Sequence, residues 1–191
     1  MNQEDELFYN KAFDLIVPFE GAVPHFYLDI HGYVTIGVGC LITGSQAPTL
    51  VMEISTPAGG YTAHPDEVLE DYVAVSKAPP ALPASSYRRF TRCSLTPLGV
   101  RSLFEKRCRE SVAQLEKLYP GFEDFPIQAR LALLDICFNV GIGNLRRNWP
   151  SLNDDIAHRD WRTAALHSHR KESSAHRNQT TEALFLEAAT A

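Results

Sequence analysis

Three side chains that could act together in catalysis lie near the start of the chain: Glu20, Asp29 and Thr35. Glu20 ends an amphipathic helical pattern, Asp29 opens a turn, and Thr35 lies in a β-branched segment. Hydrolysis of a glycosidic bond needs such a set, because one carboxyl group protonates the leaving oxygen while the other holds the attacking water. Each residue is ordinary by itself, and only their spacing within a glycine-rich segment suggests catalysis.

The elements that must position these groups are visible in the pattern. Apolar residues at helical spacing predict a first helix from about residue 4 to residue 17 or 19, which Pro18 should kink or end. Glu20 then lies at the negative end of the helix dipole, which favours the protonated carboxyl group that a general acid requires.

Residues 26–38 predict a hairpin of two short strands, with its turn at residues 29–32. Gly37 and Gly39 alternate on the second strand, where a bare backbone permits the close approach of a substrate. His31, at the tip of the hairpin, is either a sugar contact or a solvent-exposed turn residue.

The rest of the chain divides into a proline-rich part and a helical part. Residues 43–93 predict an irregular lobe with one short helix at residues 65–76. Thr96 and Pro97 mark the start of a long helix that ends near Tyr119. The helices expected after it cover residues 127–140, which are apolar nearly all round and therefore buried, 151–158 with Ser151 as N-cap, 160–168 and 175–189.

Composition excludes several classes of partner. The 191 residues carry a formal net charge of -5, which does not attract nucleic acid or anionic membranes. No apolar run approaches the roughly 18 residues of a membrane span, and the acidic N-terminus does not resemble a secretory signal. We therefore expect synthesis in the cytoplasm and, for action outside it, a separate export route.

The cysteines and histidines do not have the spacing of a metal site, so no metal and no cofactor is expected. Cys108 and Cys137 lie in apolar helical patterns typical of buried thiols. Cys40 and Cys93 flank the proline-rich segment, which leaves a disulfide between them open. His167 and His169 are two residues apart and diverge on a helix.

The two tryptophans have different expected roles. Trp149, which precedes a proline in a loop, either packs or stacks on a sugar, whereas Trp161 is expected in the core.

Eight residues separate Glu20 from Asp29, five separate Asp29 from Thr35, and Ile36-Gly37-x-Gly39 follows. The spacing of the three candidate residues resembles the catalytic segment of the T-even phage lysozymes, glycoside hydrolase family 24. Three later segments resemble that family in the same order. They are residues 133–141 for its buried central helix, 161–165 for its Trp-x-x-Ala-Ala helix, and Arg177 with 180–185 for its C-terminal helix.

The resemblance implies an α+β lysozyme-like fold in a single domain, residues 1–191. A small N-terminal lobe with the hairpin would be joined by a long linking helix to a helical C-terminal lobe. The parts would be residues 1–42 with the first helix and the hairpin, 43–93 as the inserted lobe, and 94–191 as the linking helix and helical lobe.

The same resemblance implies an N-acetylmuramidase that cleaves the β-1,4 bond between N-acetylmuramic acid and N-acetylglucosamine with inversion. Glu20 would be the general acid, and Asp29 with Thr35 would position the water. Arg177 would pair with Glu20, although a nearby guanidinium lowers a carboxyl pKa and so opposes the helix-end effect. Phe138 and Asn139 would lie where the buried helix reaches the cleft, Asn139 as a substrate contact or as a helix cap.

Three departures from the family stand out. The segment before the Thr96 helix is longer, Cys40 replaces a usual histidine, and the chain is acidic where phage members are typically basic. The longer segment would cover the cleft, extend it or bind a partner.

Two settings fit a muramidase without a signal peptide. One is a phage or prophage endolysin released through holin pores. The other is an antibacterial toxin delivered by a type VI-like secretion machine and opposed by a periplasmic immunity protein. In both, a monomer acts on peptidoglycan glycan strands in the periplasm. The alternatives are a catalytically silent peptidoglycan-binding module and, more distantly, a chitinase-like enzyme.

Overall fold

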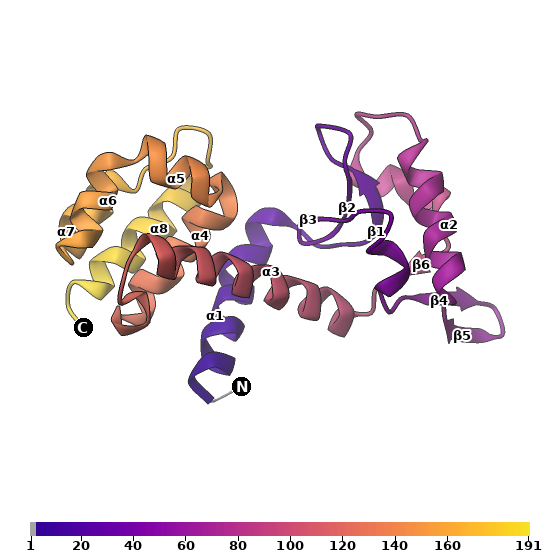
Figure 1. Ribbon diagram of the computed structural model, residues 1–191, viewed down its shortest axis with the longest axis horizontal. Helices are drawn as coiled ribbons and strands as arrows, with labels where there is room; N and C mark the ends of the chain where they lie inside the picture. The colour runs from indigo at the N-terminus through magenta and orange to yellow at the C-terminus, as the bar shows by residue number, and fades with distance from the viewer. Residues whose placement is uncertain (1–2) are drawn as a thin grey trace. The chain divides into compact units, whose positions relative to one another are not determined.

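The computed structural model describes residues 3–191, which form two compact units (Figure 1). Unit 1 comprises the chain up to Phe19 together with residues 107–191, and unit 2 comprises residues 20–106. The chain enters unit 2 at Glu20 and returns to unit 1 within one long helix, α3. Residues 43–93 belong to the same unit as the hairpin.

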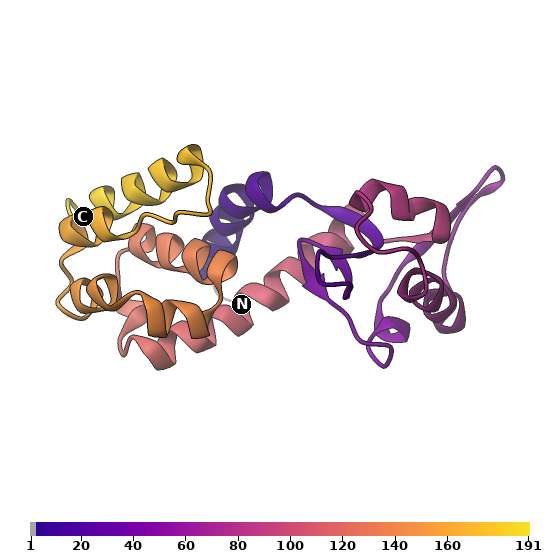
Figure 2. The same ribbon diagram turned by 90° about the horizontal axis from the view of Figure 1, so that it is seen from above.

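Unit 1 is helical. After α1 and the second half of α3 it contains a short 3-10 helix, η3, and five further helices. The bounds are α1 Gln3–Glu20, α3 Pro97–Leu118, η3 Phe122–Asp124, α4 Ile127–Val140, α5 Ile142–Asn148, α6 Pro150–Ala157, α7 Trp161–His167 and α8 Ala175–Ala188. In Figure 2, α4 lies amid the helices of this unit. It packs against α8 and α5, and its side chains are buried nearly all round, as its apolar sequence predicts.

In the core of unit 1, aromatic rings pack around Trp161. Its ring lies 5.0 Å from Phe125 in an edge-on arrangement and 6.5 Å from Phe185 in a stacked one. Trp161 is only 7% exposed, which confirms its expected place in the core.

Most helix bounds agree with the sequence. The long helix begins as expected, because the Thr96 hydroxyl accepts a hydrogen bond of 3.0 Å from the Gly99 N–H. The prediction of Ser151 as an N-cap is wrong: α6 begins at Pro150, and Trp149 is its N-cap. Proline suits this first position because its missing N–H would be unpaired there in any case.

Helix α5 was not expected. Gly141, at φ +77°, ends α4, but its carbonyl at once accepts from the Leu145 N–H at 3.0 Å. A new helix therefore starts at the glycine that closes the previous one. A glycine alone indicates an end and does not show that a second helix follows it.

Unit 2 contains two antiparallel three-stranded sheets, the helix α2 and the first half of α3. The sheets have the strand orders β1-β2-β3 and β5-β4-β6. The bounds are β1 Val23–Leu28, β2 Val34–Gly37, β3 Cys40–Leu41, η1 Ala47–Thr49, β4 Glu53–Thr56, β5 Gly59–Thr62, α2 Pro65–Ser76, η2 Ala84–Phe90 and β6 Cys93–Ser94. The β4–β5 hairpin projects from this unit in both ribbon views (Figures 1 and 2).

The core of unit 2 joins the hairpin to the proline-rich segment. Phe26 of β1 is fully buried, and its ring lies 5.9 Å from Tyr72 of α2 in an edge-on arrangement. The predicted helix at residues 65–76 is confirmed as α2, and His64 and Glu67 form a capping box at its start. Strands β4, β5 and β6 were missed because they are short, and β5 opens with two glycines that lower strand propensity.

All four cysteines are buried free thiols, so the disulfide considered between Cys40 and Cys93 is not formed. The two residues belong to different sheets, Cys40 to β3 and Cys93 to β6. Burial raises the pKa of Cys93 to about 12 and that of Cys137 to about 11.

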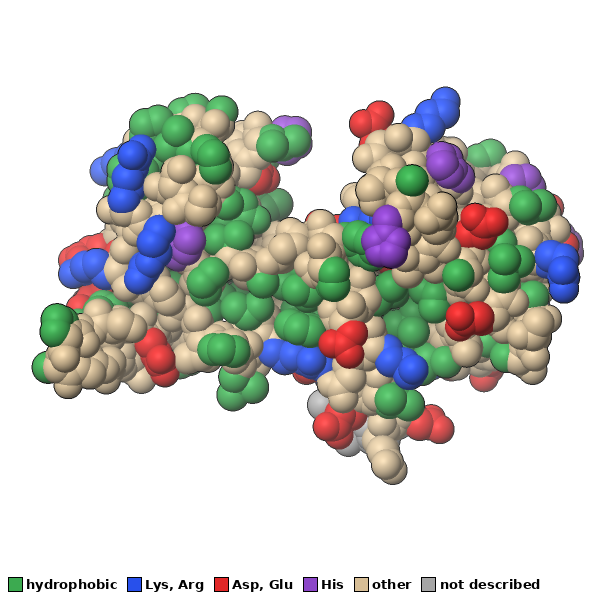
Figure 3. Space-filling view, turned by 180° about the vertical axis from the view of Figure 1, so that it is seen from behind, with side chains coloured by type: hydrophobic (Ala, Val, Ile, Leu, Met, Phe, Trp, Pro, Cys, Tyr) green, Lys and Arg blue, Asp and Glu red, His purple; other side chains and the backbone are tan. Residues whose placement is uncertain are grey.

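The surface carries both signs of charge. On the face shown in Figure 3, acidic and basic side chains are interspersed, and neither sign gathers into a continuous patch there. Within residues 3–191, no helix is both long and apolar enough to cross a membrane.

Candidate active site

Glu20 is the last residue of α1, and its side chain is exposed. Pro18 lies inside the helix and does not end it. The helix ends where Gly21 takes a φ of +75°, a left-handed conformation that a side chain disfavours. The predicted position of Glu20 at the C-terminus of the helix is confirmed, and β1 begins three residues later, at Val23.

A bulge in β1 separates Glu20 from Asp29. The ladder pairs Val23 with Gly37 and Tyr27 with Thr35, so four steps on β1 match two steps on β2. A bulge bends its strand and increases the local twist, and such irregularities are common beside active sites, where they re-aim side chains. The sequence does not reveal this one.

The Asp29 carboxylate is held by the backbone of its own turn. Its Oδ1 accepts hydrogen bonds from the N–H of His31 at 2.8 Å and from the N–H of Tyr33 at 2.9 Å. The Asp29 N–H donates in turn to the Tyr33 carbonyl at 3.0 Å. No residue in the described range 3–191 bonds to Oδ2, so this oxygen can accept a hydrogen bond from a water. The turn predicted at residues 29–32 is confirmed.

Thr35 lies on the returning strand opposite Tyr27. The ladder ends at the pair of Leu28 with Val34, and just beyond it the Asp29 N–H donates to the Tyr33 carbonyl. The Thr35 hydroxyl donates to the Tyr33 carbonyl at 3.1 Å, and the residue is only 3% exposed. The structure therefore brings these two predicted residues together through Tyr33.

Gly39 is not on the second strand, so that expectation is wrong. Strand β2 ends at Gly37, whose φ is +65°, and Gly39, with a φ of +63°, lies in the turn that leads to β3. The turn requires a left-handed backbone at both positions, and this conformation accounts for the glycine at each of them. A substrate contact by Gly39 stays a prediction.

The tip of the hairpin is exposed. His31 is exposed in the turn, and its ring centroid lies 6.5 Å from that of Tyr33, which is 59% exposed. Tyr33 was not singled out from the sequence, although an aromatic ring four residues after a candidate catalytic aspartate was a usable signal. Tyr33 and His31 present ring surface beside Asp29, and whether a sugar contacts them stays a prediction.

In unit 1, Arg177 lies in the first turn of α8 and is 5% exposed. Its Nε and Nη2 donate to Oδ1 of Asp135 at 2.9 and 2.6 Å, and its guanidinium lies 5.2 Å from the Phe19 ring centroid. The other carboxylate oxygen of Asp135 lies 2.8 Å from Nη2 of the buried Arg170. Asp135 was missed, although it is the one carboxylate in the mostly apolar helix α4. The expected pairing of Arg177 with Glu20 stays a prediction.

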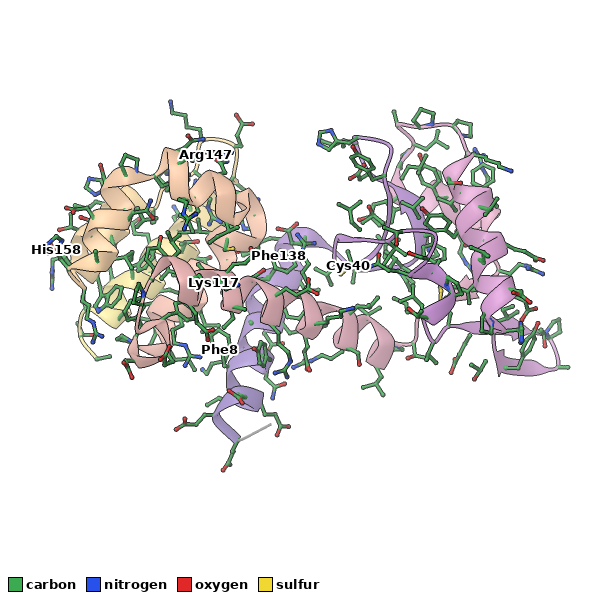
Figure 4. All side chains as sticks on the ribbon, in the orientation of Figure 1. Phe8, Cys40, Lys117, Phe138, Arg147 and His158 are labelled. Carbon is green, nitrogen blue, oxygen red and sulfur yellow. The ribbon has the colours of Figure 1, made fainter. Side chains whose placement is uncertain are left out.

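Phe138 and Asn139 lie at the end of α4 (Figure 4 labels Phe138). The Phe138 ring is buried beneath the Arg107 guanidinium at 3.8 Å. Asn139 is exposed, and its Oδ1 accepts from the Ser173 hydroxyl at 2.9 Å. The cap of α4 is the Gly141 N–H bond to the Cys137 carbonyl, so the structure does not use Asn139 as the helix cap. Substrate contact by either residue stays a prediction.

One histidine of the remaining candidate pair for metal binding is engaged by a hydrogen bond. His167 Nδ1 lies 2.6 Å from the Asp155 carboxylate. In the described part of the chain, no group of three or more histidine, cysteine, aspartate or glutamate side chains could hold a metal ion. The candidate site therefore has two carboxyl groups. Asp29 is fixed by the backbone of the hairpin turn, and Glu20 is exposed at the end of α1.

No protein-family model matches this sequence, and no curated protein matches it.

Proposed function

We propose that the protein is a peptidoglycan hydrolase with a lysozyme-like fold, an N-acetylmuramidase that cleaves the β-1,4 bond between N-acetylmuramic acid and N-acetylglucosamine. The observation that carries the proposal is the Asp29 carboxylate, which two backbone N–H groups hold through Oδ1. This arrangement leaves Oδ2 to take a proton from a water. The exposed carboxyl group of Glu20 supplies the second group that the reaction needs.

The roles follow from proton balance. Glu20, in its acid form, donates a proton to the glycosidic oxygen as the bond to the anomeric carbon breaks. Asp29 accepts a proton from the water that attacks the opposite face of the same carbon, and the product carries an inverted anomeric hydroxyl. Thr35 is a positioning residue, because its buried hydroxyl holds the peptide of Tyr33 to which Asp29 is bonded.

The architecture supports the fold assignment at a coarse level. The long helix α3 connects the mainly helical unit 1 with unit 2, which contains the β1–β2 hairpin, and the resemblance implies this arrangement. Arg177, which the resemblance matches to the arginine of the family's C-terminal helix, is buried near the start of α8. Either release through holin pores or delivery by a type VI-like machine would bring such an enzyme to peptidoglycan, and in the second case an immunity protein is the proposed partner.

The test compares three proteins on purified peptidoglycan: wild type, Glu20→Gln and Glu53→Gln. Glu53 is an exposed glutamate of β4 in the same unit and serves as the matched control. We expect wild type and Glu53→Gln to release muropeptides with new reducing ends, identified by mass. Glu20→Gln should release them at least about 100-fold more slowly, which is the low end of the contribution of a general acid.

Two outcomes would reject the proposal. A folded wild type that sediments with peptidoglycan but releases no reducing ends is a binding module. A wild type that cleaves chitin oligomers but not peptidoglycan is a chitinase-like enzyme. Equal rates for wild type and Glu20→Gln would remove Glu20 from the role of acid.

A further inference from the structure

We propose that unit 1 has a second binding site, distinct from the hairpin, for a small organic anion with an apolar body. The site is a hollow of about 510 Å³ between the end of α3, the segment before α4, and helices α5 and α6. Small-molecule sites typically measure roughly 300 to 1,000 Å³ and combine apolar walls with a few polar groups. The lining residues used in the argument are Tyr119, Phe125, Arg146, Asn153, Ile156 and Arg159.

The inner wall is apolar and rigid. Phe125 and Ile156 are buried, at 6% and 0% exposure. The Tyr119 hydroxyl donates to the Asn153 side-chain oxygen at 2.5 Å, and burial raises the pKa of Tyr119. The Asn153 amide nitrogen donates to the carbonyls of Leu145 and Arg146 at 3.0 and 3.3 Å. These bonds fix the backbone from which Arg146 extends, so one cation of the site is attached to an ordered frame.

The second cation, Arg159, occupies a place where glycine is usual. It follows α6 with a φ of +55°, the left-handed conformation that commonly ends a helix and that favours glycine or asparagine. An arginine there is disfavoured, and an observed backbone outlier of this kind is grounds for a functional hypothesis. Its guanidinium lies 5.3 Å from the Phe125 ring centroid, so it is held over the apolar wall.

Neither guanidinium has an ion-pair partner within residues 3–191. The Asp124 carboxylate lies near Arg159 without an ion pair, since a Cβ built at Gly121 would be 3.5 Å from Asp124 Oδ2 and 3.6 Å from Arg159 Nη2. The two carboxylates that flank Arg159 in the loop after α6 have other neighbours. Asp154 lies 3.7 Å from His158, and Asp160 accepts from the N–H and the hydroxyl of Thr163. Two unpaired guanidiniums beside an apolar wall complement a carboxylate or phosphate group carried on a ring or a short chain.

The binding test uses the full chain and four probes measured by isothermal titration. They are 1-naphthoate, 1-naphthyl phosphate, the neutral 1-naphthalenemethanol, and acetate, which has the charge without the ring. We expect the two naphthyl anions to bind at least about tenfold more tightly than the neutral alcohol and than acetate. The two anions distinguish a carboxylate from a phosphate preference. Binding of no probe, or equal binding of the anions and the alcohol, would overturn the proposal.

Variants locate the site. Arg146→Gln combined with Arg159→Asn removes both charges, and asparagine tolerates the left-handed backbone. We expect a loss of at least about tenfold in affinity for naphthoate. Arg147→Gln is the matched control, because Arg147 is the next residue of α5 (Figure 4) and does not line the hollow. Wild-type affinity in the double variant would also overturn the proposal. Because the probe comparison uses only wild type, the proposal remains testable if the double variant does not fold.

Discussion

The Asp29 carboxylate and the Thr35 hydroxyl are bonded to the same residue, Tyr33. Asp29 Oδ1 accepts from the Tyr33 N–H at 2.9 Å, and Thr35 Oγ1 donates to the Tyr33 carbonyl at 3.1 Å. The backbone of one residue therefore sets the position of both side chains. A change at Thr35 is expected to act on the proposed chemistry by moving this backbone, whereas a change at Asp29 removes the proposed water-holding oxygen directly.

Substitution of Asp29 should separate stability from activity. Asp29→Asn keeps an oxygen that accepts from His31 and Tyr33, so we expect a change of less than about 0.5 kcal/mol in unfolding free energy. Activity should fall at least about 100-fold, because an amide does not accept the proton of water. Urea unfolding and the reducing-end assay on the same samples measure the two effects.

Asp29→Ala is the companion variant. It removes both hydrogen bonds of the turn, and we expect a loss of about 1 to 2 kcal/mol in addition to the loss of activity. An Asp29→Asn protein that hydrolyses peptidoglycan at the wild-type rate would contradict the assigned role.

Thr35→Val and Thr35→Ser test the buried hydroxyl. Valine keeps the shape but removes the hydroxyl bond to the Tyr33 carbonyl, which then keeps only its bond from the Asp29 N–H, so we expect a loss of about 1 kcal/mol in stability together with reduced activity. Serine keeps the hydroxyl and should retain most of the activity while losing one buried methyl group, at about 1 kcal/mol. If valine and serine have equal activity, the hydroxyl does not position Asp29.

Asp135 should be among the most sensitive residues of unit 1. It is 1% exposed, and Arg170 and Arg177 both lie against its carboxylate. Asp135→Asn leaves buried guanidiniums without that charge, and removal of one partner of a buried ion pair costs about 3 to 5 kcal/mol. Urea unfolding measures this cost. Asp14→Asn, at an exposed position of α1, is the control and should change stability by less than about 0.5 kcal/mol.

The buried thiols predict how stability depends on alkaline pH. The folded-state pKa of Cys137, about 11, and that of Cys93, about 12, lie above the usual value near 8.5. Above pH 9 the unfolded chain therefore loses thiol protons that the folded chain keeps, and the unfolding free energy falls as pH rises toward 11. Urea unfolding at pH 7.5, 9 and 10 should show this fall. A double variant, Cys93→Ala with Cys137→Ala, should lose less over the same range, and an equal loss would contradict the assignment.

The elements that depend on local interactions were predictable from the sequence. Apolar spacing, a threonine cap and a helix-starting proline locate α3, and acidic first-turn residues after Pro65 locate α2. The turn at Asp29 follows from residue types that bond to their own backbone. These features depend on neighbours within a few positions of the chain, so the sequence contains the information directly.

Other features were decided only by tertiary structure. The bulge in β1 comes from pairing with a second strand, and the short strands β4 and β6 exist because they pair across distant positions. Asp135 is an isolated acid in an apolar helix until packing of α8 and its preceding loop brings Arg170 and Arg177 to it. The residue types and the spacing of Glu20, Asp29 and Thr35 are written in the sequence. The backbone geometry that leaves one oxygen of Asp29 open exists only after the hairpin has formed, because the bonds that hold the other oxygen belong to the folded turn.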